Sequence, residues 1–155
     1  MRPRFLLFAL LFAAVPALRA QAVRSLRVNV LRQLEFGQLI GGVDAAMGPA
    51  DAKATALFEV IGPAGATAQL MFTLPTELIG ESGGRVGLSF GAQSAAYSVN
   101  ESSVDNIPFD PRAPFSLKIP ASGRVVVIVG GMARPSRQLI SGKYSGNLSL
   151  SVSTQ

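Results

Sequence analysis

A chain of 155 residues has the length of a single domain. It contains neither cysteine nor histidine. This composition excludes disulfide bonds, thiol catalysis and cysteine-bound metals, and it removes the commonest general base and transition-metal ligand. The net charge of +5 suggests an acidic partner at first, and the positions of the basic residues decide whether that suggestion holds.

The first 22 residues have the pattern of a secretory signal peptide. Two arginines precede an apolar run over residues 5–15, Pro16 interrupts it, and small residues follow up to Ala22. The run is about half the ~20 residues that a membrane-spanning helix needs, which favours a cleaved signal over an anchor. We therefore expect export to the periplasm, the cell surface or the medium, with cleavage after Ala22 or, alternatively, after Ala20.

Cleavage would remove most of the excess positive charge. Arg2, Arg4 and Arg19 lie within the signal, so of the 14 basic residues 11 remain, against 9 acidic ones. The resulting net charge of +2 comes without a run of basic residues and interleaved aromatics, so nucleic-acid binding has no support. We expect a protein partner, no nucleic acid, and no integral membrane segment after cleavage.

Residues 23–155 predict one all-β domain. Short apolar or alternating segments are bounded by glycine or proline, at residues 26–30, 34–37, 57–61, 68–74, 85–90, 115–119, 124–130 and 144–152. Seven or eight short strands with frequent turns are typical of an antiparallel β-sandwich. We predict a core that includes Leu34, Phe36, Leu57, Phe72, Val127, Leu148 and Leu150.

Two stretches are predicted as loops. Residues 41–54 are rich in glycine and alanine, and residues 97–114 are polar and contain three prolines. One alternative stays open, because residues 49–60 begin with Pro49 and are rich in alanine, which suits the start of a helix. The β-branched and aromatic residues at the end of that stretch argue against a long helix.

Three stretches together resemble one family of exported bacterial proteins. They are LEFGQLIGG at residues 34–42, FEVIGPAGATAQLMFTLP at residues 58–75 and ISGKYSGNLSLSVS at residues 140–153. In order and spacing they are similar to the domain-of-unknown-function 4402 family, and the similarity covers residues 26–153. The resemblance implies an immunoglobulin-like, pilin-like sandwich and no established activity.

The C-terminal stretch also resembles the ends of chaperone–usher pilus subunits. Gly142 is the fourteenth residue from the end, and an alternating apolar strand follows it. Two features depart from that pattern: Thr154 stands where those subunits have an aromatic residue, and their common disulfide is absent. The resemblance implies a strand that pairs with a chaperone or a neighbouring subunit.

The two ends of the domain supply the candidate assembly strands. Strand pairing between chains uses backbone hydrogen bonds for affinity and alternate side chains for register. The candidates are Leu26, Val28 and Val30 at the N-terminal end, and Gly142, Tyr144, Leu148, Leu150 and Val152 at the C-terminal end. The alternative is that both are ordinary first and last strands of a complete domain, and the pattern alone leaves both open.

The sequence contains no recognisable catalytic pattern. The glycine-rich residues 41–48 match no phosphate-binding motif, and Lys143 is followed by Tyr144 rather than the serine or threonine of a P-loop. The acidic residues form no pair that suggests acid–base chemistry, and Asp105, Asn106 and Asp110 lack calcium-loop spacing. We expect no enzyme activity, no metal and no cofactor.

These observations predict an exported structural subunit of a pilus-like or adhesive surface assembly that assembles by β-strand pairing. Self-association or a periplasmic chaperone and usher would supply the partner. The alternative is a self-complete periplasmic or secreted sandwich that binds a glycan or a protein. The two hypotheses differ in whether residues 23–33 pair within their own domain.

Overall fold

The computed structural model describes residues 25–51, 54–99 and 106–154, and every regular element in these ranges is a β-strand. The predicted signal peptide at residues 1–22 lies outside the described residues. In the described part of the chain, no helix has the length and apolar character needed to span a membrane.

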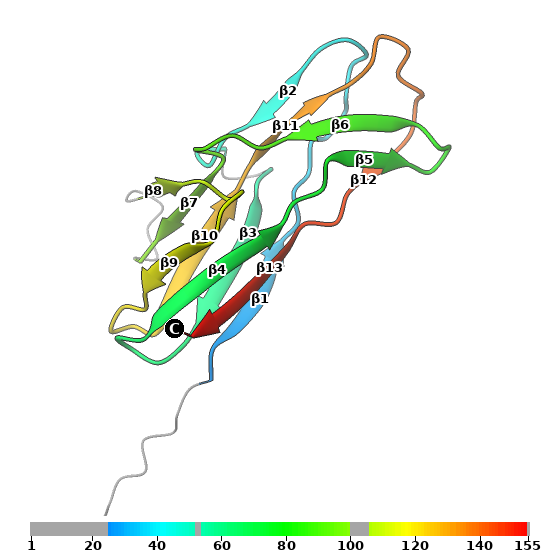
Figure 1. Ribbon diagram of the computed structural model, residues 1–155. Helices are drawn as coiled ribbons and strands as arrows, with labels where there is room; N and C mark the ends of the chain where they lie inside the picture. The colour runs from blue at the N-terminus through cyan, green and yellow to red at the C-terminus, as the bar shows by residue number, and fades with distance from the viewer. Residues whose placement is uncertain (1–24, 52–53, 100–105, 155) are drawn as a thin grey trace, which may run out of the picture.

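Two antiparallel sheets face each other in the lower part of the molecule (Figure 1). The large sheet contains, in spatial order, β1 (Arg27–Arg32), β3 (Ala56–Ile61), β10 (Arg124–Val129), β7 (Ala95–Ser98) and β8 (Ile107–Phe109). The small sheet contains β13 (Ser149–Thr154), β4 (Thr67–Thr73) and β9 (Phe115–Lys118).

A third antiparallel sheet extends the sandwich upwards, and we call it the distal sheet (Figure 1). Its strands, in spatial order, are β12 (Tyr144–Ser145), β5 (Glu77–Gly80), β6 (Arg85–Ser89), β11 (Gly131–Arg134) and β2 (Ala45–Met47). Most of these strands follow or precede a strand of the large or small sheet directly along the chain. For example, β10 and β11 are separated only by Gly130. The distal sheet therefore lies on the same chain segments as the sandwich below it.

The predicted all-β antiparallel sandwich is confirmed, with more strands than the seven or eight expected. The described residues form thirteen strands, but β2/β3, β4/β5, β6/β7, β10/β11 and β12/β13 are five pairs of successive strands on one pass of the chain. If each of these pairs is counted as one pass of the chain, the thirteen strands form eight passes. The pattern predicts seven of these passes and misses β8, whereas its remaining segment, residues 34–37, forms no strand. Glycines and short irregular segments divide the passes into separate strands.

The main core lies between the large and small sheets, and a second core lies against the distal sheet. Among the predicted core residues, Val127 and Leu148 are buried in the main core and Phe36 in the second. Three others are partly buried against these cores: Leu34, Phe72 and Leu150.

The placement of Leu57 in the core is wrong. The flanking Ala56 and Phe58 are both fully buried and belong to the main core. Since successive side chains of a strand point to opposite faces, Leu57 points to the outer face of the large sheet, where it is only partly buried.

The predicted loops contain short strands. Residues 41–54 include β2, and residues 97–114 include β8 and the end of β7. Residues 34–37 were predicted as a strand but form none. The helical alternative for residues 49–60 is wrong in the part that the structure describes, because β3 occupies its second half.

Candidate functional site

The sandwich is open along the side where β1 and β13 lie. Among the described residues, β1 is an edge strand of the large sheet and β13 an edge strand of the small sheet, and each is hydrogen-bonded to one neighbouring strand. The two strands lie side by side (Figure 1) without a ladder between them. We call this surface the open side.

Inward-facing side chains on the open side are incompletely covered. Leu26, Val28, Leu150 and Val152 pack against the main core but are only partly buried. Val60 and Leu70, the ladder partners of Val28 and Val152, are fully buried. The core residues in the middle of the sandwich are thus fully buried, whereas those along this edge are only partly buried.

The incomplete cover of side chains on the open side is clearest at Val30. It lies opposite Phe58 in the β1/β3 ladder, and residues directly opposite each other place their side chains on the same face. Phe58 is fully buried in the core, whereas Val30 is 53% exposed although it points to the same side. Val30, at the register shift of β1, thus leaves about half of its apolar side chain exposed at this end of the open side.

The two edges differ in how they are protected. On β1 the register shifts between Val30 and Arg32, and the Arg32 side chain donates from Nε to the carbonyl oxygen of Thr55 at 2.7 Å. Such a bulge and the charged side chains blunt an edge. The strand β13 carries neither a charge, a proline nor a bulge, and its register with β4 is continuous from Ser149 to Thr154. The bare edge of the open side is thus β13.

A groove of about 740 Å³ continues the open side towards the distal sheet. It is lined by residues from the segment after β1, from the β4–β5 pass and from the β12–β13 connection: Gln33, Leu34, Glu35, Pro75, Glu77, Ile79, Tyr144, Ser145, Gly146 and Asn147. A Cβ atom at Gly146 would lie 2.9 Å from Leu78 Cδ2 and 3.3 Å from the carbonyl oxygen of Glu77, so a larger residue here would require the Leu78 side chain to move. The groove and the open side form one surface.

The opposite side of the sandwich is closed by aromatic rings. Phe109 at the end of β8 stacks on Phe115 at the start of β9, with ring centroids 4.4 Å apart and planes 15° apart. Tyr97 packs on Phe115 with a centroid distance of 5.5 Å. The edge strands here also carry Pro108 and Lys118, residues typical of protected edges.

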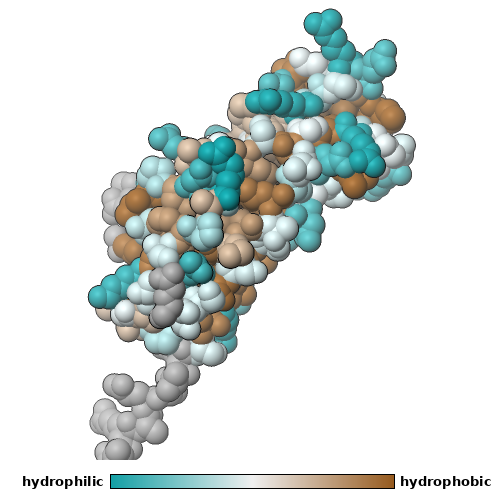
Figure 2. Space-filling view, in the orientation of Figure 1, coloured by the Kyte–Doolittle hydropathy of each residue, from teal (hydrophilic) through white to brown (hydrophobic). Residues whose placement is uncertain are grey.

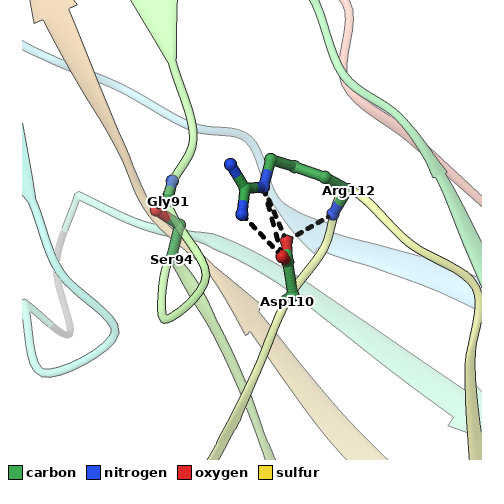
Figure 3. Close-up of polar contacts among 4 residues, drawn as sticks. All are labelled: Gly91, Ser94, Asp110 and Arg112. Atoms are coloured by element: carbon green, nitrogen blue, oxygen red, sulfur yellow. Dashed lines mark hydrogen bonds and ion pairs between the residues drawn. The ribbon is translucent and has the colours of Figure 1, made fainter.

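The turn between β8 and β9 is fixed by an ion pair, which Figure 3 shows. Arg112 donates from Nε to Asp110 Oδ1 at 2.9 Å and from Nη2 to Oδ2 at 2.7 Å, and its backbone N–H donates to Oδ1 at 2.9 Å. The hydrogen bonds from the Arg112 side chain, more than those from its backbone, lower the pKa of Asp110 from 3.8 to about 2. Both carboxylate oxygens of Asp110 are thereby engaged by the Arg112 guanidinium.

The structure divides the predicted assembly residues into two groups. Leu26, Val28, Val30, Leu148, Leu150 and Val152 all belong to β1 or β13 or lie next to them on the open side. Gly142 lies in the connection between β11 and β12, away from both edge strands, and no atom lies within 4 Å of a Cβ built there. Tyr144 lies on β12 and lines the groove.

Most residues of the groove carry no functional signal in the sequence. Glu35, Pro75, Glu77 and Ile79 come from separate segments, and no local pattern marks them as neighbours. Ile79 is 53% exposed, and this exposed apolar side chain on a strand is the one signal that the groove offers.

The described residues contain no group of three or more carboxylate, histidine or cysteine side chains arranged to hold a metal ion. Asp105, one of the three polar residues considered for calcium, lies outside the described residues. Comparisons of the chain with models of protein families, with curated proteins and with solved structures found no match.

Proposed function

We propose that this protein is an exported structural subunit of a pilus-like or adhesive surface assembly, and that it assembles by accepting a β-strand at its open side. The observation that supports this proposal is the exposure of Val30 opposite the fully buried Phe58, next to the bare edge of β13. A further strand along β13 would cover the inner face at this point.

Backbone pairing alone would hold such a strand weakly. Each hydrogen bond contributes about 0.5–1.5 kcal/mol net, and fixing each residue of the incoming strand costs about 1–2 kcal/mol of conformational entropy. Apolar side chains must therefore supply the affinity. Val28, Leu150 and Val152 offer partly buried apolar surface at alternate positions, which suits an alternating strand.

The N-terminal strand is engaged within its own domain. β1 pairs with β3 from Arg27 to Arg32, and Asn29 donates from Nδ2 to Glu59 Oε2 at 2.9 Å. A role for β1 as a strand donated to a neighbour would require it to leave this sheet. We therefore propose that the open side accepts a strand from another chain while β1 stays in place.

The experiment compares two substitutions at similarly exposed positions. Val30→Lys places a charge on the open side, and Ile107→Lys places one on β8, at the opposite edge of the large sheet; the parent side chains are 53% and 47% exposed. Light scattering of the exported chain over a range of concentrations, with thermal melting, measures assembly and folding. We expect Val30→Lys to reduce assembly and Ile107→Lys to leave it unchanged, with similar melting temperatures. Equal loss of assembly in both variants would place the contact elsewhere.

A second candidate is a self-complete binding module for a glycan or a protein. Its support is the engagement of β1 within the domain together with exposed apolar residues at the distal end. Ile40, Val43 and Ile140 are 64%, 53% and 50% exposed, and their two loops are joined by hydrogen bonds from Gly42 N to the carbonyl oxygens of Pro135 and Ser136. Figure 2 shows hydrophobic side chains at the upper end of the face in view. A wild type that stays monomeric at every soluble concentration would favour this candidate.

A further inference from the structure

The outer and inner faces of β13 have a composition that suits pairing with an identical strand. Ser149, Ser151 and Ser153 are exposed on the outer face, while Leu150 and Val152 face the core and are partly buried. The strand carries no charge, so two copies side by side create no repulsion.

The neighbouring strand extends this neutral surface. On the outer face of β4, the residues opposite the three serines are Gln69, Met71 and Thr73, which are also uncharged. β1, in contrast, carries Arg27 and Arg32, and a copy of itself alongside would bring like charges together. Of the two edge strands on the open side, only β13 can lie beside its own copy without bringing like charges together.

We propose that β13 pairs antiparallel with β13 of a second copy, around a twofold axis that passes beside Ser151. This inference rests on the proposed function, because it names the strand that the open side accepts. A twofold contact closes at two copies, so the pair would be the unit from which a larger assembly is built. The pair would join two three-stranded small sheets into one continuous sheet. The distal sheets of the two copies would then point in opposite directions, since the paired strands are antiparallel.

The side-chain period fixes which registers are allowed. Residues directly opposite each other share a face, so an inward residue must lie opposite an inward residue of the partner. A twofold axis beside Ser151 meets this condition, because it places Leu150 opposite the partner's Val152, and Val152 opposite the partner's Leu150. The partly buried side chains of the open side then cover one another. Ser149 lies opposite the partner's Ser153 on the outer face.

Single cysteines test this register cleanly, because the native chain contains no cysteine. Directly opposite residues of an antiparallel pair have Cα atoms about 4.5–5.5 Å apart, within the range that a disulfide bridges. We expect Ser151→Cys to form a covalent dimer on mild oxidation. Ser153→Cys alone should not, whereas a mixture of Ser149→Cys and Ser153→Cys chains should cross-link. All three positions are exposed, so folding should be unaffected.

A charge exchange at Ser151 gives a second readout. Ser151→Lys and Ser151→Glu should each dissociate the dimer, because the twofold axis places each new charge opposite its own copy. An equimolar mixture of the two variants should dimerise again, as a heterodimer. Recovery in the mixture excludes misfolding as the reason for the loss in the separate variants.

Failure of this inference differs from failure of the proposed function. Assembly that depends on Val30 but shows neither the Ser151→Cys cross-link nor the charge rescue would overturn the twofold β13 pair and leave strand addition in place. A chain that never assembles would overturn both. Cross-linking of Ser153→Cys with itself would place the axis beside Ser153 and overturn the register proposed here.

Discussion

Gly130 and Met47 approach each other so closely that no side chain fits between them. A Cβ atom at Gly130 would lie 2.0 Å from the carbonyl oxygen of Met47, a backbone atom that cannot turn aside. Gly130 separates β10 from β11, and Met47 is the last residue of β2. This close approach therefore lies where the distal sheet joins the large sheet.

Gly130→Ala should therefore destabilise the protein, by about 1–3 kcal/mol or more, because the backbone must shift to admit the methyl group. Gly91→Ala is the control, since the nearest atom to a Cβ there is Ser94 Oγ at 3.7 Å and Gly91 has no positive φ. Its effect should stay within about 0.5 kcal/mol. Denaturant unfolding of both variants measures the difference, and equal midpoints would contradict the close contact.

The strand at the open side gives a graded prediction. Leu148 is 4% exposed, so Leu148→Ala should cost about 2–5 kcal/mol of unfolding free energy. Leu150 is only partly buried, and Leu150→Ala should cost less. Ser149→Ala on the outer face should change stability by less than about 0.5 kcal/mol. If dilute monomer showed equal losses for Leu148→Ala and Leu150→Ala, β13 would be covered in the isolated chain.

The sequence predicts which way a strand faces better than it predicts what covers it. The alternation from Leu148 to Val152 correctly places these apolar residues towards the core. The same alternation at Leu26, Val28 and Val30 predicts one face but not the exposure of Val30. Exposure depends on a neighbouring strand, and a period of two contains no information about a neighbour that is far away in sequence.

The groove and the shortest strands were beyond prediction for a related reason. β2 has three residues and β12 has two, so neither extends far enough to show a period. Both are strands because the long passes beside them, β11 and β5, offer ladder partners. The groove likewise forms only when residues 33–35 and 144–147 meet in space.

Export is the premise of the proposed function and has its own test. The two arginines, the apolar run over residues 5–15 and the small residues before Val23 predict cleavage after Ala22. Intact-mass measurement of the exported protein should show a chain that starts at Val23, or at Gln21 for the alternative site. An uncleaved product that stays inside the cell would contradict export and return the full excess of basic residues to the protein.

The ion pair in the β8–β9 turn predicts a pH dependence. The folded-state pKa of Asp110 is lowered from 3.8 to about 2, so the stabilisation is present above pH 3.8 and is lost as the pH falls towards 2. Asp110→Asn should melt at a lower temperature than the wild type at neutral pH, by a small margin because the pair is exposed to solvent. The difference between the two melting temperatures should shrink steadily from pH 3.8 to pH 2. A difference of undiminished size at pH 2 would show that the Arg112 pair is not its cause.

Substitutions on β1 decide whether this strand belongs to its own domain or serves a neighbour. Val28 lies opposite the fully buried Val60 and packs against the core, so Val28→Asp places a carboxylate on partly buried apolar surface. The monomer should lose at least about 1–3 kcal/mol of stability, unless the carboxylate is neutralised by taking up a proton. Val30→Asp, on the same face but 53% exposed, should keep the fold and weaken only the assembly. Circular dichroism melting of dilute protein, combined with light scattering at high concentration, separates the two effects. If Val28→Asp melted like the wild type but no longer assembled, β1 would be dispensable to its own domain, and the donor strand would be β1 itself.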